Sequence, residues 1–379
     1  MNASTPANDT PFCYSINSPP FKRQSAISSV YFSAIFSTLG LISNFVAFIV
    51  LVKSFHRTHN RSRSSFLIFL GGLVVTDFSG LLVTGSIVIS FHLTGFNWRS
   101  LDPHCHFCNF MGMSMVFYGL CPLLLGATMA VERFIGINRP FARFTAMPKS
   151  RTVSMVLTVW LLAGLIALLP VVGLGSYHIQ FPGSWCFFNV SFEGSDQVFS
   201  LLFSLTGLLS IGVSFLLNTV SFVTLIKLCC KQDRTQRRRD HEIEMMVQLL
   251  LIMVIASICW CPLLIYILMM SGVPTDAAHG KKVLFYVRMA SCNQIFDPWI
   301  YIMCQVSRLR RVKCKSEPQS CNHNVAFPHC AAHMCLRCQH AVAADVHRVH
   351  RTMQIFALAS RFIVPLECSL SVTAARMLV

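Results

Sequence analysis

Residues 66–91 read FLIFLGGLVVTDFSGLLVTGSIVISF, and Asp77 is the sole charged residue in this run. A helix rises about 1.5 Å per residue, so a helix of this length can cross a hydrocarbon layer of about 30 Å. Only helices and closed barrels cross lipid, because backbone polar groups have no water there. A barrel strand alternates apolar and polar residues over about 10 positions. This run therefore predicts a transmembrane helix.

Six more apolar runs accompany it along the chain. The seven predicted spans are 28–52, 66–91, 108–137, 153–174, 198–228, 245–270 and 283–304. Only 12% of the residues are charged, against about 25% in a typical soluble domain. The sequence thus predicts an all-α membrane protein whose domain at 28–304 is a seven-transmembrane helix bundle.

Lys and Arg are concentrated in every second loop, which predicts the orientation. They follow the first, third and fifth spans at Lys53, Arg57, Arg61, Arg63, Arg139, Arg143, Lys149, Arg151, Lys227, Lys231, Arg234, Arg237, Arg238 and Arg239, whereas the segment 175–197 has none. We expect the N-terminus outside, with a tail at 1–27, and a short basic juxtamembrane segment inside at 305–313. The net charge of +16 then belongs to membrane-flanking segments, and nucleic acid is not an expected partner.

The predicted outer side carries two further kinds of signal. Three glycosylation acceptor motifs fall there, at Asn2, Asn8 and Asn189. Four cysteines lie on the same oxidising side, at Cys13, Cys105, Cys108 and Cys186. Four such cysteines favour two disulfides, and their spacing leaves the connectivity open.

Arg288 is the most informative ionisable residue, because charges inside a membrane are costly and usually functional. It lies in the outer half of the last span. A guanidinium does not deprotonate in proteins, so it requires an acidic partner or a wet cavity. A ligand carboxylate would complete a bidentate pair. The alternative is a structural pair with an internal carboxylate or with loop carbonyls, and this feature alone favours neither.

A second group of residues lies toward the predicted inner side. Glu132 and Arg133 end the third span, and Glu242 opens the sixth. An arginine between two carboxylates would form a lock that breaks when helices separate, although interfacial snorkelling also explains charges there. Pro262 and Pro298 remove helix hydrogen bonds and bend their spans, which suits a switch or a static bend.

From about residue 28 to 305 the chain resembles class A (rhodopsin-like) G-protein-coupled receptors. The resemblance rests on one mark or more in each of several spans: Asn44, Asp77, Cys108 with Cys186, Glu132-Arg133-Phe134, Trp160, Cys259-Trp260-Cys261-Pro262 and Asp297-Pro298-Trp299-Ile300-Tyr301. Each mark is weak alone, and their order is specific. The resemblance implies a multi-pass protein of the plasma membrane that couples to a heterotrimeric G protein on the cytoplasmic face.

Within that class the chain is similar to prostanoid receptors. The loop 180–187 reads QFPGSWCF, Arg288 falls where these receptors bind the ligand carboxylate, and Asp297 replaces the more usual Asn. The resemblance implies a lipid-derived carboxylic acid as ligand, most specifically thromboxane A2 or its endoperoxide precursor, with Gq-type signalling and calcium release. It also implies disulfides that pair Cys108 with Cys186 and Cys13 with Cys105.

Residue roles carry over in the same way. The expected ligand-binding residues are Arg288, Ser184, Trp185, His92, Thr84 and Trp260. The expected activation switch and G-protein coupling residues are Glu132, Arg133, Glu242, Pro262, Asp77, Asp297, Pro298 and Tyr301.

Residues 314–379 lie outside the resemblance. They hold six cysteines and several histidines at irregular spacing, so we expect no metal and no cofactor. Cys314 follows a basic stretch and is a candidate for palmitoylation, the alternative being an unmodified thiol in a disordered tail.

Two rival classes predict patterns that the spans lack. A transporter of an organic anion would show internal repeats with broken helices in both halves. A membrane enzyme would cluster His, Asp or Glu at one depth. We therefore expect a receptor and not an enzyme, with a different prostanoid as the alternative ligand.

Overall fold

The structure is a computed structural model that describes residues 13, 30–58, 61–95, 97–138, 148–190, 194–231, 236–270 and 279–316. The expectations for Asn2, Asn8 and the tail after residue 316 lie outside this part of the chain. So do those for the outer tail, Cys13 excepted.

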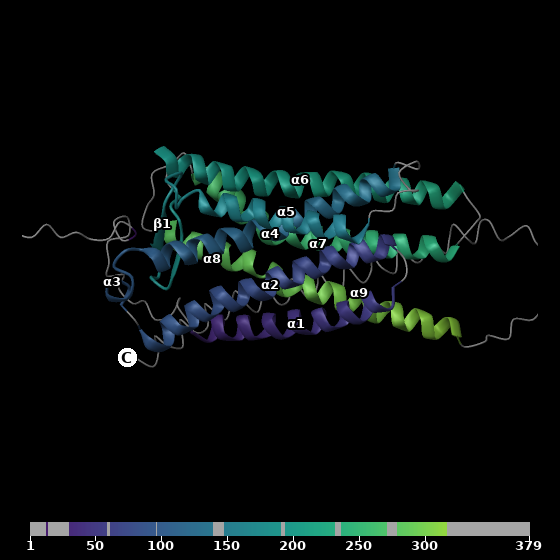
Figure 1. The fold of residues 1–379 in the computed structure, drawn as a ribbon, viewed down its shortest axis with the longest axis horizontal. Coiled ribbons are helices and arrows are strands. Elements are labelled where there is room, and N and C mark those ends of the chain that lie inside the picture. Colours follow the sequence, from purple (N-terminus) through teal and green to yellow (C-terminus); the bar gives the residue numbers. More distant parts are fainter. Residues whose placement is uncertain are drawn as a thin grey trace, which may run out of the picture.

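Long helices lie side by side along the long axis of the molecule (Figure 1). Six of them are long and apolar enough to cross a membrane within the described part of the chain. These are α1 (Val30–His56), α2 (Arg61–Thr94), α4 (His106–Asn138), α5 (Lys149–Leu168), α6 (Gly194–Lys231) and α7 (Gln236–Met270). The predicted bundle is confirmed. The helix ends lie within six residues of the predicted ones, except that α7 begins nine residues before its predicted span.

The predicted seventh span at 283–304 falls on two helices in direct succession, which are separated by one residue. The structure has α8 (His279–Ser291) and α9 (Asn293–Ser316), with Cys292 between them. The backbone N–H of Cys292 is shared between the carbonyls of Arg288 and Met289, each at 3.2 Å. The sequence analysis placed the bend at Pro298, which lies inside α9.

Helix α4 lies at the centre of the bundle and packs against α2, α5, α6 and both strands. Its side chains Leu120, Leu125 and Met129 are almost fully buried. By contrast, large apolar side chains on α5 and α6, such as Leu161 and Leu209, are exposed. An outward apolar surface of this kind suits lipid rather than water as the surrounding solvent.

A hairpin and a short helix close one end of the bundle, which we call the hairpin end (Figure 1). Strand β1 (Tyr177–Gln180) pairs antiparallel with β2 (Trp185–Phe188), and α3 spans Trp98–Leu101. Gly183 adopts a φ of 97° in the connecting turn, a conformation that favours glycine. The sequence analysis did not anticipate this hairpin, because strands of four residues leave little periodicity to detect.

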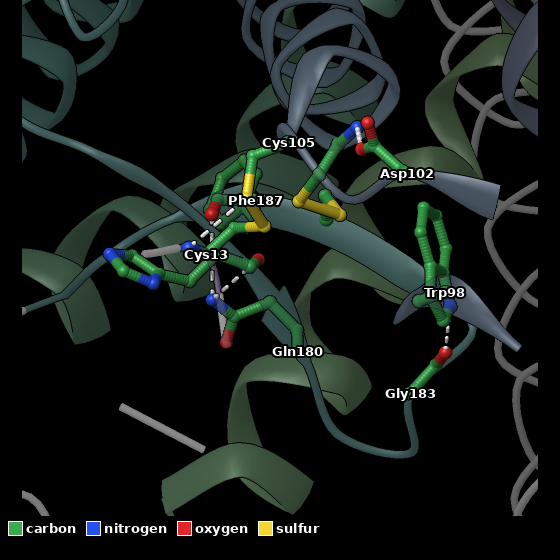
Figure 2. The surroundings of a disulfide bond; sticks show 10 residues. Cys13, Trp98, Asp102, Cys105, Gln180, Gly183 and Phe187 are labelled. Carbon is green, nitrogen blue, oxygen red and sulfur yellow. Dashed lines mark hydrogen bonds between the residues drawn. A yellow bond between two sulfur atoms is a disulfide. The ribbon is translucent and has the colours of Figure 1, made fainter. Parts of the chain in front are cut away.

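Two disulfides tie the hairpin end together. Cys108 at the start of α4 pairs with Cys186 in β2, and Cys105 pairs with Cys13 (Figure 2). The indole N–H of Trp98 in α3 also donates to the carbonyl of Gly183 at 2.6 Å (Figure 2). The hairpin is therefore fixed to both α4 and α3, so that its inner residues form a rigid cover over the bundle.

Candidate ligand-binding site

A cavity of about 30 Å³ lies between the hairpin and the middle of the bundle. Residues from α2, α4, α6, α7, α8, α9 and β2 line it: Thr84, Met115, Tyr118, Gly119, Phe187, Phe203, Trp260, Leu263, Val287, Ala290, Ser291 and Gln294. Phe187 of β2 contributes the hairpin side. A largely apolar lining with a few polar groups is typical of small-molecule sites, whose volumes are about 300–1,000 Å³. A ligand would therefore require the residues around this cavity to move apart.

Two of the expected ligand-binding residues line this cavity, namely Thr84 and Trp260. The hydroxyl of Thr84 donates to the carbonyl of Gly80 in its own helix at 2.7 Å. Arg288 is half-buried in the last turn of α8. It lies directly after Val287 and three residues before Ser291, and both of these line the cavity. Residues three apart share a helix face, so Arg288 lies beside the site.

The other expected residues lie in the hairpin or near the end of α2. Ser184 and Trp185 are buried in the hairpin, and the Trp185 indole N–H donates to the carbonyl of Phe181 at 2.9 Å. The Trp185 ring lies 5.8 Å from that of Phe187, which does line the cavity. His92 lies near the end of α2, with its ring 5.6 Å from that of Phe91. None of these three residues lines the cavity itself.

The sequence analysis missed several lining residues, including Tyr118, Ser291 and Gln294. Nothing in the local sequence distinguishes a residue that faces the cavity from one that faces a neighbouring helix. Their position at the cavity depends on how the helices pack against one another.

The place of Trp260 depends on a glycine. A Cβ added at Gly119 would lie 2.9 Å from Cη2 of the Trp260 indole. This distance is shorter than van der Waals contact, so only a residue without a side chain leaves the ring where it is. Gly119 therefore holds open the space that the indole occupies.

At the opposite end of the bundle, Arg133 is almost fully buried and bound on several sides. Its Nε lies 3.0 Å from Oε2 of Glu132. Its Nη1 donates to the Ser62 hydroxyl and its Nη2 to the Ser62 carbonyl, both at 2.7 Å. The guanidinium also lies 5.5 Å from the centre of the Phe66 ring. This latch joins α4 to the start of α2. The side chain of Glu242 lies outside the described part of the chain.

Two carboxyl groups lie in the interior between the cavity and the latch. Asp77 and Asp297 are both buried, and Asn293 donates to Asp297 Oδ2 at 2.8 Å. Asn293 and Asp297 also line a second cavity of about 30 Å³. The remaining switch candidates are placed around them: Pro262 lies inside α7, and the buried Tyr301 accepts from Gln305 at 3.2 Å.

A polar network braces the hairpin against the start of α6. The Ser176 hydroxyl donates to Asp196 Oδ1 and also lies 2.8 Å from Nε2 of His178. The Asn189 side-chain amide donates to Asp196 Oδ2 at 2.6 Å. Burial lowers the pKa of His178, against the opposing effect of the Asp196 carboxylate. The network keeps the hairpin in place over the cavity.

The chain is similar to known proteins in sequence and in fold. Residues 43–301 match the 7 transmembrane receptor (rhodopsin family) profile. The thromboxane A2 receptor of Rattus norvegicus is 49% identical over 300 residues, which cover 77% of this chain and 87% of that receptor. The thromboxane A2 receptor of Homo sapiens is 47% identical over 311 residues, covering 79% and 90%.

More distant similarities point to the same family. The prostaglandin F2-alpha receptor of Homo sapiens is 39% identical over 307 residues, which cover 79% of this chain and 84% of that receptor. Squid rhodopsin superposes with a TM-score of 0.61 at 18% identity, covering 82% of this chain and 86% of its own, which supports the fold alone. By profile, relatives and fold together, the chain belongs to the rhodopsin family of 7 transmembrane receptors.

Proposed function

We propose that this protein is a plasma-membrane receptor for a prostanoid, with thromboxane A2 or its endoperoxide precursor as the preferred ligand. The observation that carries the proposal is the difference in similarity among relatives. Identity to thromboxane A2 receptors is 46–50%, and identity to prostaglandin F2-alpha receptors is 38–39%. The chain is thus nearer to receptors named for the first ligand than to those named for the second.

The ligand's carboxylate would pair with Arg288, and its apolar chains would enter the cavity below the hairpin. This assignment agrees with the charge of Arg288, its position beside Val287 and Ser291, and the apolar lining of the cavity. It places the hairpin end, with both disulfides, on the outside of the membrane. Bridges at that end suit an oxidising compartment.

Signal transfer would link the cavity to the latch at Arg133. The ligand would contact Trp260 in α7, two residues before Pro262, where the helix can bend. A ligand that binds one arrangement of α7 more tightly shifts the population toward it. At the opposite end, the same shift would release Arg133 and open a surface for a heterotrimeric G protein of the Gq type.

Calcium release in cells that express this chain tests the proposal. Cells would be exposed to a stable thromboxane A2 mimic, to prostaglandin F2-alpha and to other prostanoids at graded concentrations. We expect the thromboxane mimic to be the most potent and mock-transfected cells to give no response. A stronger response to another prostanoid would make that prostanoid the preferred ligand. No response to any prostanoid would contradict the proposed class of ligand.

A further inference from the structure

Trp260 differs from Trp98, Trp160 and Trp185 in how its indole N–H is used. The chain has five tryptophans. Trp98 donates to Gly183, Trp160 to the Thr76 hydroxyl at 3.1 Å, and Trp185 to Phe181, while Trp299 is half exposed on α9. Trp260 is only 6% exposed, yet its Nε1 has no hydrogen-bond partner among the described residues.

A buried N–H without an acceptor is unfavourable, because the water that it loses on folding is not replaced. The cavity that Trp260 lines has a volume of about 30 Å³. One water needs about 10–15 Å³, so an oxygen atom fits beside the indole. A water, or an oxygen atom of a ligand, can therefore supply the missing acceptor.

Two of the hydroxyl groups that line the cavity, those of Thr84 and Ser291, are committed as donors to backbone carbonyls, whereas Tyr118 and Gln294 carry further donors there. Thr84 gives its proton to the carbonyl of Gly80, and Ser291 gives its proton to the carbonyl of Val287 at 2.9 Å. Both hydroxyls therefore present lone pairs to the cavity. The Trp260 N–H is held in a fixed position because its ring lies against Gly119, which makes it a preorganised donor.

We propose that the Trp260 indole N–H donates a hydrogen bond to an oxygen atom on the buried chain of the ligand, so that Trp260 determines specificity for oxygenated over purely hydrocarbon chains. This inference rests on the proposed function, since it assumes a fatty-acid-derived ligand. Arg288 selects the acid end, and Trp260 selects oxygen at the other end. A site with a buried donor rejects ligands that leave it unpaired.

The test crosses two receptors with two ligands. The ligands are a stable prostanoid agonist with a hydroxyl on its lower chain and the same compound with that hydroxyl replaced by hydrogen. Competition binding is measured on the full-length parent and on Trp260→Phe, which keeps a ring and loses the N–H. We expect the parent to prefer the hydroxyl compound by about 3- to 10-fold, as for one net hydrogen bond, and Trp260→Phe to bind both nearly equally.

Using the ratio of the two affinities removes other effects of the substitution. A change in folding, expression or conformational balance alters the binding of both ligands alike. Trp160→Phe is the matched control, since the N–H that it removes bonds Thr76 and does not line the cavity; its ratio should equal that of the parent. If Trp260→Phe does not fold, replacing Trp260 with benzothienylalanine removes the N–H and keeps the ring shape.

Each outcome decides the matter. A ratio that falls toward one in the Trp260 variants and not in Trp160→Phe supports the proposal. A parent that binds both compounds equally, or a parent preference that persists in the Trp260 variants, shows that the N–H does not bond the ligand hydroxyl and overturns the proposal, although the receptor function stands. A parent chain that binds neither compound contradicts the proposed function itself.

Discussion

Asn44 Nδ2 in α1 donates to the carbonyl of Gln294 in α9 at 2.8 Å. That carbonyl lies four residues before Pro298, which has no N–H to donate back to it. The same amide nitrogen also contacts the carbonyl of Gly40 in its own helix at 2.9 Å. A side chain of the first span therefore satisfies the backbone group that a proline of the seventh span leaves open.

Replacing Asn44 with Ala should destabilise the bundle. The Gln294 carbonyl would remain buried between α1 and α9 without this donor, at a cost of about 1–3 kcal/mol. Thermal unfolding in detergent would measure a lower Tm. Ser43→Ala is the control, because the Ser43 hydroxyl is also buried and donates to the Gly40 carbonyl within α1. Equal losses from the two substitutions would contradict the bridging role of Asn44.

Gly119→Ala should weaken ligand binding. The added methyl would press on the Trp260 indole, and overpacking of this kind typically costs about 1–3 kcal/mol. The expected result in radioligand binding is about a 10-fold loss of affinity or a shift in basal signalling. Gly126→Ala, one heptad further along α4, is the control, since its Cβ would meet only the Ser214 hydroxyl at 3.9 Å. Unchanged binding in Gly119→Ala would show that Trp260 has room to move.

The bundle was predictable because lipid imposes a simple requirement on sequence. Each span must be apolar for about 20 residues, and this is visible without knowledge of any contact. The interruption of the helix at Cys292 is not visible in this way, although polar residues (Ser291, Asn293 and Gln294) flank it. It reflects a competition between the carbonyls of Arg288 and Met289 for one N–H, and such local geometry leaves no mark in hydropathy.

The site was predictable in its charges and not in its lining. Arg288 and Asp77 stand out because charge inside a membrane is rare. Tyr118 and Gln294 line the cavity but look ordinary in sequence. The latch at Arg133 shows the same limit. Glu132 is the carboxylate neighbour that the sequence predicts, but Ser62 supplies two contacts that depend on where α2 begins.

Arg288→Ala should lower the affinity for a labelled prostanoid by about 2–5 kcal/mol, as for one partner of a buried charge pair. Arg288→Lys should recover part of the loss, because an ammonium keeps the charge and cannot form a bidentate pair. Lys281→Ala removes an exposed charge at the start of the same helix and should bind like the parent. Parent-like affinity in Arg288→Ala would contradict the proposed pairing of Arg288 with the ligand carboxylate.

Asn189 should carry no glycan, although its sequence motif is an acceptor. Its amide nitrogen, the atom that would be modified, donates to Asp196 at 2.6 Å and lies in a half-buried position beside β2. On a denaturing gel, the band shift that glycosidase treatment produces should therefore be unchanged in Asn189→Gln. The shift should become smaller when Asn2 and Asn8 are replaced. A faster band from Asn189→Gln alone would show that a glycan breaks the contact with Asp196.

Ser62→Ala should raise signalling in the absence of ligand. The substitution removes the hydroxyl that binds Arg133 Nη1 and leaves the carbonyl contact in place. Hydrogen bonds to charged groups contribute about 1.5–3 kcal/mol. If part of that energy holds the resting arrangement, basal inositol phosphate production should rise by about 3- to 10-fold. Ser62→Thr keeps a hydroxyl and should return the basal level toward that of the parent.

A merely structural role for Ser62 would have a different signature. A structural role would lower expression and ligand binding together in Ser62→Ala. Ser62→Thr, which carries an extra methyl group, would not restore either of them. Ser79→Ala provides the control within the same helix, because the Ser79 hydroxyl bonds only carbonyls of α2. Basal signalling that rises in Ser62→Ala, stays low in Ser79→Ala and falls again in Ser62→Thr would place the resting latch between α4 and α2. A flat basal level across all three would mean that the Arg133 contacts seen here do not restrain activation.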